Sequence, residues 1–269
     1  MGTLKQVLTI AGSDSGGGAG IQADIKAMSA NGVFAMSVIT AVTAQNTEEV
    51  TDVFELPPAM VAAQMDAVFD DFDVAAVKTG MLSSREIVST VAARLKAQQV
   101  AHLVVDPVMV SKSGHRLLKP DAVDALVSEL IPLAELLTPN IHEAQQLSGI
   151  TITSLADARQ AAKKLAQLGS RYVLIKGGHL LAERGTDLLY DGRFFTLFKG
   201  EFIDTRHTHG TGCTYASAIA AQLARGKSMA DAVQAAKTYV TDAIRHSLAI
   251  GHGQGPTNHF YFLQQESTT

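Results

Sequence analysis

The sequence predicts an α/β fold with a mainly parallel central sheet and helices on both faces of that sheet. Short, nearly continuous apolar runs alternate along the chain with longer segments of helical period, which is typical of strands covered on both sides. Hydrophobic residues make up 46% of the 269 residues and charged residues 18%, the composition of a compact globular enzyme. We therefore expect one domain that spans residues 1–269.

Six apolar runs, rich in β-branched residues, have the length of buried strands. They lie at residues 7–11, 37–42, 75–78, 103–106, 136–138 and 172–176. The stretch 187–198 differs, because two β-prone runs there flank the turn dipeptide Asp191-Gly192. It predicts a hairpin that adds antiparallel strands late in the chain.

Two of the helices have readable boundaries. Ser154, with Asp157 three residues later, predicts a capping box in front of an apolar stripe that ends before Gly169. A second stripe runs from Ser228 to Ile244. Each stripe predicts a helix that packs one face against the sheet.

The charge pattern indicates which classes of binding partner the protein has. The formal net charge is −4, the pI is near 6.1, and the basic residues are dispersed, which argues against a nucleic-acid surface or a polybasic membrane anchor. No stretch approaches the roughly 18 apolar residues of a membrane span, and the single cysteine cannot form an internal disulfide. We expect small-molecule partners and a cytoplasmic location.

In an open parallel sheet, ligands bind beyond the carboxyl ends of the strands, and these positions are rich in glycine and polar residues here. They are residues 13–20, 45–46, 79–81, 106–107, 140–143 and 176–179. The most specific signal comes later, at residues 208–214, where Thr208 and a Gly210-Thr211-Gly212 turn precede an alanine-rich helix. The exposed N–H groups and the helix dipole of such a turn bind phosphate, although a tight turn before a buried helix has the same pattern.

Cys213 stands in the first turn of that helix. The dipole predicts a stabilised thiolate, which would accept a proton from a reacting hydroxyl or contact it. An isolated cysteine elsewhere in the chain would be read as inert core.

This turn resembles the anion hole of the ribokinase-like kinases, most of whose sugar kinases have Asp where Cys213 stands. The cysteine, together with Ala11-Gly12-Ser13-Asp14 and the glycine-rich residues 16–24, is similar to the hydroxymethylpyrimidine and phosphomethylpyrimidine kinases of thiamin biosynthesis. The resemblance covers nearly the whole chain. Further matching motifs lie at residues 43–46, 78–82, 106–109, 138–143, 176–179 and 251–256.

The resemblance implies a pyrimidine pocket shaped by Gly12, Ala19 and Asp24, with Thr43, Met81 and Val108 as its walls. Gln45 also has a chemical reason to be there, because its amide offers the donor and acceptor that match an aminopyrimidine edge. Taken alone, Gln45 would be a loop amide, Asp24 a partner of its helix dipole, and the wall residues simple packing. The spacing of Gly16, Gly18 and Gly20 does not give the dinucleotide fingerprint, so a Rossmann-type cofactor is not expected.

Magnesium and phosphate ligands follow other strands. Asn140 and Glu143, with Asp106, would hold the Mg²⁺ that a kinase needs; a capping box explains the Asn140 and Glu143 spacing equally well. Lys176 ends a strand before two glycines and would reach a phosphate, and the resemblance implies the same for Lys237. Either could instead be a solvated lysine. Residues 112–116 are expected to form a flap over the site.

The expected activity is ATP-dependent phosphorylation of 4-amino-5-hydroxymethyl-2-methylpyrimidine, with Mg²⁺, Lys176 and the amides of residues 210–213 offsetting charge on the transferred group. The resemblance adds a second phosphorylation, of the monophosphate, and a homodimer. Cys213 is either a general base or a group that orients the acceptor hydroxyl. The alternatives are a pyridoxal or pyridoxine kinase, dual specificity for both rings, and, from other classes, a nucleotide sensor or a dinucleotide oxidoreductase.

Overall fold

The computed structural model describes residues 4–110, 114, 117–177 and 184–263. Within them nine strands form one sheet, in the order β3-β2-β1-β4-β5-β6-β7-β8-β9. The strands are β1 (Gln6–Asp14), β2 (Phe34–Gln45), β3 (Val50–Glu55), β4 (Val74–Thr79), β5 (Leu103–Val105), β6 (Leu136–Leu137), β7 (Tyr172–Ile175), β8 (Thr186–Tyr190) and β9 (Phe195–Lys199). Strands β2, β1, β4, β5, β6 and β7 are parallel, whereas β3, β8 and β9 are antiparallel to their neighbours.

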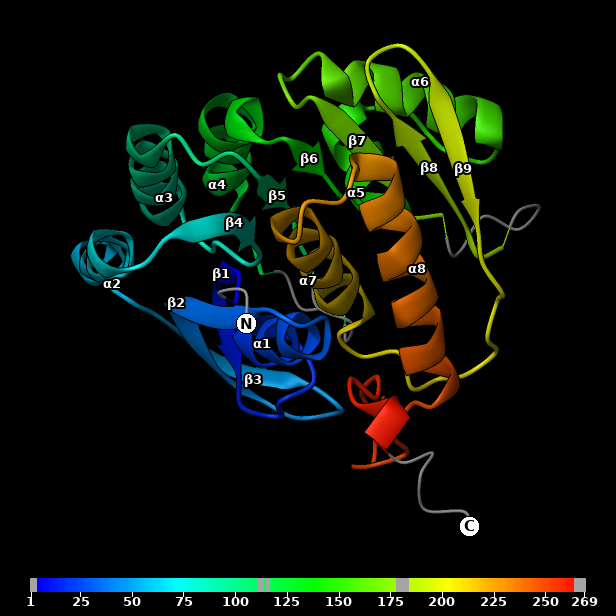
Figure 1. The fold of residues 1–269 in the computed structure, drawn as a ribbon, viewed down its shortest axis with the longest axis horizontal. Helices are drawn as coiled ribbons and strands as arrows, with labels where there is room; N and C mark the ends of the chain where they lie inside the picture. Colours follow the sequence, from blue (N-terminus) through cyan, green and yellow to red (C-terminus); the bar gives the residue numbers. More distant parts are fainter. Residues whose placement is uncertain (1–3, 111–113, 115–116, 178–183, 264–269) are drawn as a thin grey trace.

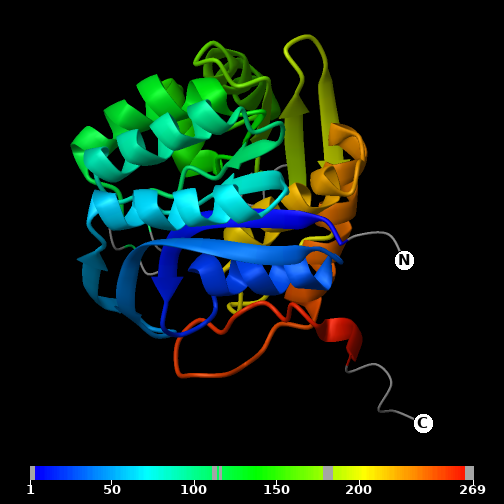
Figure 2. The same ribbon diagram turned by 60° about the vertical axis from the view of Figure 1, so that its left-hand side comes forward.

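Helices cover both faces of this sheet (Figures 1 and 2). One face carries α1 (Gly20–Ala30), α7 (Thr211–Ala224) and α8 (Met229–Arg245). The other carries α2 (Pro58–Asp71), α3 (Arg85–Gln98), α4 (Pro120–Ala125), α5 (Ile141–Ser148) and α6 (Leu155–Ala166). The predicted fold class is therefore confirmed.

Two apolar cores lie on the two sides of the sheet. Successive residues of a strand point to opposite faces, so Ala76 of β4 joins the core under α7 and Val77 joins the core under α3. Helix α7 is buried over almost its whole length, which explains why its sequence is alanine-rich: small side chains let it lie close to the sheet. Its N-terminus is thereby held at the end of the parallel strands.

The predicted helix starts are seen in the structure. Ser154 accepts the N–H of Asp157, and the Asp157 side chain accepts the N–H of Ser154, so the capping box forms at α6. At the start of α8, Ser228 Oγ accepts the N–H of Asp231, without the reciprocal bond of a capping box. The predicted hairpin at 187–198 corresponds to β8 and β9, which pair antiparallel.

Two features of the sheet differ from the prediction. Strand β2 extends three residues beyond the predicted run at each end, and β3 was not predicted at all. Strand β3 lies at the edge of the sheet, with Thr51, Asp52 and Phe54 exposed, so its sequence lacks the apolar run of a covered strand. Among the described residues no helix combines the length and apolar character needed to cross a bilayer.

Candidate active site

A cavity of about 810 Å³ opens where the parallel strands end and α7 begins. Every site residue predicted from the sequence lines this cavity, with the exception of Asp24. The cavity-lining residues among them are Gly12, Ala19, Thr43, Gln45, Met81, Asp106, Val108, Asn140, Glu143, Lys176, Thr208, Gly210, Thr211, Gly212, Cys213 and Lys237. Segments far apart in the sequence thus meet at one place, as the carboxyl-end rule predicts.

Residues 208–213, the anion loop, turn sharply into α7. Gly210 is the N-cap with φ +79°, a conformation that favours glycine, and no side chain of the described residues caps the helix there. Thr211 Oγ1 donates instead to the Thr208 carbonyl, at 2.8 Å. The Thr211 N–H donates to the same carbonyl, whereas Gly212 and Cys213 line the cavity, where an anion can use their N–H groups and the positive end of the helix dipole.

Cys213 lies in the same turn, and its thiol is more basic than the sequence suggests. Burial raises the pKa of Cys213 to about 11; Lys78 and the Gly20 N–H oppose this rise, and Asp24 and Asp106 add to it. The expected thiolate is therefore not favoured at this site, because desolvation disfavours the charged form of the thiol. At neutral pH the side chain is a thiol that can donate or accept one weak hydrogen bond.

Lys176 and two acids, Asp106 and Glu143, lie beside the anion loop, with Lys176 Nζ and an Asp106 oxygen next to Gly212. Lys176 Nζ lies 2.7 Å from Asp106 Oδ1, which also accepts from Thr138 Oγ1 at 3.0 Å. Burial alone would lower the pKa of Lys176, but Asp106 and Glu143 outweigh it and raise that pKa. Lys176 is therefore fully charged in the cavity.

Glu143 and Asn140 form the capping box of α5. Asn140 Oδ1 accepts the Glu143 N–H at 2.9 Å, and Glu143 Oε2 accepts the Asn140 N–H at 2.8 Å. Burial raises the pKa of Glu143 to about 7; Lys176 opposes the rise and Asp106 adds to it. The capping-box explanation of the Asn140 and Glu143 spacing is thus correct. Both residues nevertheless line the cavity, and Lys176 only partly offsets the effect of burial on the Glu143 carboxylate.

Lys237 reaches the cavity from α8. Its Nζ lies 2.7 Å from Asp187 Oδ2, and Asp187 Oδ1 accepts the Gly177 N–H at 3.0 Å. Asp187 thus connects the helix lysine to the end of β7. Burial raises the pKa of Tyr215, which also lines the cavity, and Asp187 adds to that rise.

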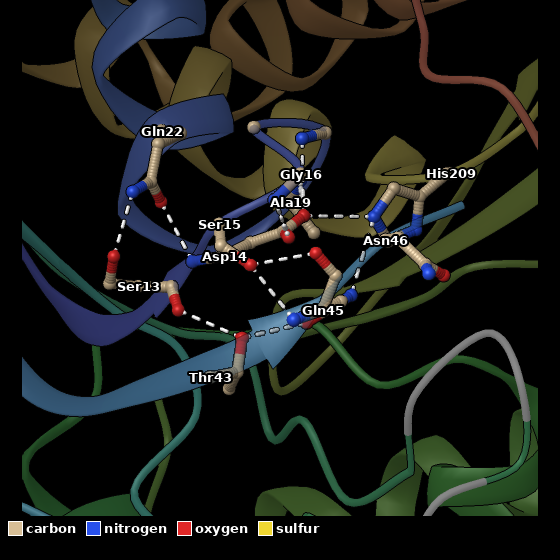
Figure 3. A network of polar contacts seen from close by, with 12 residues as sticks. Ser13, Asp14, Ser15, Gly16, Ala19, Gln22, Thr43, Gln45, Asn46 and His209 are labelled. Carbon is tan, nitrogen blue, oxygen red and sulfur yellow. Dashed lines mark hydrogen bonds and ion pairs between the residues drawn. The ribbon is translucent and has the colours of Figure 1, made fainter. Parts of the chain in front are cut away.

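The glycine-rich loop, residues 14–20, is organised by the carboxylate of Asp14 (Figure 3). Oδ1 accepts the Gly16 N–H, and Oδ2 accepts the N–H groups of Gly18 and Ala19. Asp14 Oδ2 also lies 2.9 Å from His209 Nε2 of the anion loop. One buried carboxylate therefore joins the two glycine-containing loops of the site.

Gln45 ends β2 beside this junction. Its main chain makes a reciprocal pair of hydrogen bonds with Ser15 Oγ, at 2.7 and 2.8 Å, and so fixes the strand end against the glycine-rich loop. The side-chain amide lies between Thr43 Oγ1, at 3.1 Å, and His209 Nε2, at 3.4 Å. Gln45 is therefore anchored at the cavity wall and is not a free loop amide.

Asp24 does not belong to the cavity surface, which corrects the prediction that it binds substrate. Its carboxylate is fully buried and accepts from Lys78 Nζ, at 2.8 and 2.9 Å, from Thr9 Oγ1 and from Ser217 Oγ. With these donors in place it has no open position for a ligand. Asp24 instead neutralises Lys78 of β4, whose side chain is also fully buried.

Sequence reasoning missed the roles of Asp14, Lys78 and Asp187. A signal existed in two cases, because Lys78 and Asp187 are charged residues within otherwise apolar β-runs. Asp14 stands in one of the family motifs, but the motif alone gives it no role. The predicted flap, residues 112–116, lies outside the described residues except for Gly114, as does His179.

Known proteins share the sequence and the fold of this chain. The sequence family described as Phosphomethylpyrimidine kinase matches residues 14–258. The hydroxymethylpyrimidine/phosphomethylpyrimidine kinase of Haemophilus influenzae is 51% identical, over 97% of this chain and 99% of its own length. The Thiamine biosynthesis bifunctional protein ThiED of Geobacter sulfurreducens is 52% identical over 94% of this chain, which spans only 52% of that relative.

Solved structures are similar over nearly the whole chain. A pyridoxal kinase of Bacillus subtilis, in complex with ADP, has a TM-score of 0.90 at 39% identity and covers 97% of this chain and 100% of its own. The phosphomethylpyrimidine kinase of Clostridium difficile has a TM-score of 0.81 at 48% identity, over 89% of this chain and 99% of its own. The fold is therefore ribokinase-like, as the resemblance implied, and the chain belongs to the phosphomethylpyrimidine kinase family.

Proposed function

We propose that the protein transfers the γ-phosphate of ATP to 4-amino-5-hydroxymethyl-2-methylpyrimidine and then to the resulting monophosphate, in thiamin biosynthesis. The observation that carries this is the cavity itself, in which an anion loop, Lys176 and the Gln45 amide line one continuous space. Phosphoryl transfer needs positioned positive groups more than covalent chemistry. The family and its relatives supply the substrate class.

ATP fits the part of the cavity between α8 and the anion loop. Val240 and Ile244 of α8 line it together with Phe202 and Ile203, so this part offers apolar walls for a nucleobase. Lys237 stands on the same helix at the cavity wall. We assign it to the nucleotide phosphates, with Asp187 holding the ammonium in place.

Asp106 and Glu143 fit a magnesium ion that is held by carboxylates, waters and substrate phosphates. Asp106 raises the pKa of Glu143 and Lys176 lowers it, so a divalent cation bound beside the two carboxylates would favour the charged form of Glu143. Bound there, Mg²⁺ would neutralise the triphosphate. Among the described residues no set of three or more His, Cys, Asp or Glu could hold a metal without such outside ligands.

The residues of the chain then do three things. The first-turn N–H groups of α7 and Lys176 face the charge on the transferring phosphoryl group. Thr43, Gln45, Met81 and Val108 hold the ring. Cys213, a thiol at neutral pH, contacts the hydroxymethyl oxygen and orients it for in-line attack.

A pyridoxal kinase is the second candidate, because several solved neighbours have that activity, among them an enzyme of Staphylococcus aureus with AMP-PCP and pyridoxal, at 36% identity and a TM-score of 0.90. Gln45 favours the aminopyrimidine, since the B6 ring lacks the adjacent donor and acceptor. The test is ATP consumption with each ring, by the parent and by Gln45→Met. The pyrimidine assignment fails if the parent prefers pyridoxal by orders of magnitude. A homodimer and a cytoplasmic location stay predictions.

A further inference from the structure

The side-chain amide of Gln45 lies between two polar groups that come from different segments (Figure 3). In the structure Gln45 Oε1 lies 3.1 Å from Thr43 Oγ1 and Gln45 Nε2 lies 3.4 Å from His209 Nε2, although the two ends of an amide are distinguished only by the hydrogen bonds they make. An amide oxygen only accepts hydrogen bonds and an amide NH₂ only donates them. The two neighbours therefore decide which way round the amide is held, and with it what Gln45 offers to a ligand in the cavity.

The Asp14 carboxylate fixes the state of His209 Nε2. Asp14 Oδ2 is 2.9 Å from Nε2 and also accepts two backbone N–H groups of the glycine-rich loop. Burial alone would raise the pKa of Asp14, but the His209 bond and the N–H groups of Ala19 and Gly16 outweigh it and lower that pKa. The carboxylate is thus ionised and can only accept, so Nε2 carries a hydrogen. Nε2 cannot then accept a hydrogen bond from the NH₂ of Gln45.

Thr43, at the other end of the Gln45 amide, requires the same orientation of that amide. Its hydroxyl has one hydrogen, and Oγ1 lies 3.0 Å from the Ser13 carbonyl oxygen, which can only accept. When that hydrogen goes to Ser13, Oγ1 is left as an acceptor. The end of Gln45 beside Thr43 must then be the NH₂ group, and the end beside His209 must be the oxygen. Every donor in the cluster then has an acceptor.

We infer that the Gln45 amide is held the other way round, with its oxygen toward His209 and its NH₂ toward Thr43, and that His209 and Thr43 are the positioning residues that thereby set the ring specificity of the site. This inference rests on the proposed function. After both contacts the amide keeps one acceptor lone pair and one N–H for a ligand. These match the amino group and the adjacent ring nitrogen of an aminopyrimidine.

The direction of the amide also sets the direction of the ring. In the substrate the amino group stands between that ring nitrogen and the carbon that bears the hydroxymethyl group. An acceptor on the His209 side draws the amino group to that side, and the hydroxymethyl group follows it toward the loop that carries Cys213. The reversed amide would place an N–H against the amino group and disfavour the same ring pose.

Matched variants test the inference. His209→Met removes the donor, whereas His209→Gln keeps an N–H near the place of Nε2. Thr43→Val removes the acceptor at constant shape, and Thr43→Ser keeps it; this pair is independent of the Asp14 contact. Each purified variant is assayed at saturating ATP with the aminopyrimidine alcohol and with its 4-desamino analogue, as substrate or competitive inhibitor, and its thermal unfolding is recorded.

We expect His209→Met and Thr43→Val each to reduce the preference for the amino over the desamino compound by on the order of tenfold, mainly through KM. His209→Gln and Thr43→Ser should keep that preference. In a Gln45→Met background the same changes should no longer alter it, because they act through the amide.

Two results would overturn the inference: equal losses for both compounds in His209→Met and Thr43→Val, or an undiminished effect on the preference in the Gln45→Met background. If a variant at His209 or at Thr43 does not fold, the two variants at the other position still test the inference. A parent enzyme that phosphorylates neither compound would overturn the proposed function together with the inference. A parent that phosphorylates the aminopyrimidine, with variants of unchanged preference, would overturn the inference alone.

Discussion

Gly210 lies directly against the backbone of Gly18: a Cβ added to Gly210 would stand 1.8 Å from the Gly18 carbonyl oxygen. The anion loop and the glycine-rich loop therefore interlock main chain to main chain. The buried contact between Asp14 and His209 joins the same two loops a short distance away. The phosphate end and the ring end of the cavity are thus held in one fixed relation.

Gly210→Ala should disrupt both loops. The new methyl group would collide with backbone that cannot move aside, and the residue has φ +79°. We expect a loss of stability well above the roughly 1 kcal/mol of a strained alanine alone, and a large loss of kcat. Urea unfolding and initial rates measure these. Gly226→Ala is the control, because Gly226 has φ +86° with nothing within 4 Å of its added Cβ; equal effects of the two changes would contradict the packing argument.

The position of the cavity could be predicted from the sequence because the residues with suitable chemistry stand at strand ends, which is where the topology of a parallel sheet places a ligand site. Glycines, an amide and lysines at strand ends are visible in a sequence, and the parallel order brings strand ends together. The hydrogen-bond partners of those residues cannot be read from the sequence. Asp24, for example, has the same sequence pattern as a ligand-binding acid, and only the folded chain brings Lys78, Thr9 and Ser217 to its carboxylate. Strand β3 was hidden for a similar reason, since an exposed edge strand carries little apolar signal.

Breaking the buried pair of Asp24 and Lys78 should destabilise the fold rather than weaken substrate binding. Asp24→Asn or Lys78→Met alone leaves one buried charge unpaired, which typically costs about 3–5 kcal/mol. The double variant Asp24→Leu with Lys78→Met should cost less than the sum of the single changes. Chemical unfolding gives these values.

The exposed pair of Asp66 and Arg94 provides the control, and Asp66→Asn should have no measurable effect on unfolding. If Asp24→Asn left stability intact and raised KM for the pyrimidine alone, Asp24 would be a substrate ligand after all.

Cys213→Ala should lower kcat by about 100-fold or more while KM for the pyrimidine changes little, because the thiol acts on the reacting oxygen. Cys213→Ser should retain more activity, since a hydroxyl can also orient the acceptor. Steady-state kinetics of the parent, Cys213→Ala and Cys213→Ser give kcat and KM for this comparison. An unchanged kcat in Cys213→Ala would remove this residue from the chemistry.

His259 should make the fold sensitive to acid. Its Nε2 lies 2.9 Å from the buried Thr214 Oγ1, and burial, with a smaller contribution from Lys26, lowers its pKa to about 4. The unfolded chain has a histidine pKa of about 6.5, so protonation favours unfolding. This stability is complete above pH ~6.5 and is lost as pH falls toward 4, by up to about 3 kcal/mol.

His259→Gln should remove that part of the pH dependence. Urea unfolding of parent and variant at several values between pH 7.5 and pH 4.5 measures it, and identical slopes for the two proteins would refute the assignment.

The most direct test of the central claim follows the products by ³¹P NMR when the enzyme is given ATP, Mg²⁺ and 4-amino-5-hydroxymethyl-2-methylpyrimidine. We predict that a phosphate monoester of the pyrimidine forms first and that a diphosphate ester replaces it, with one ADP released in each step. If no phosphorylated pyrimidine forms while the same enzyme converts pyridoxal to its phosphate, the cavity has been assigned to the wrong ring.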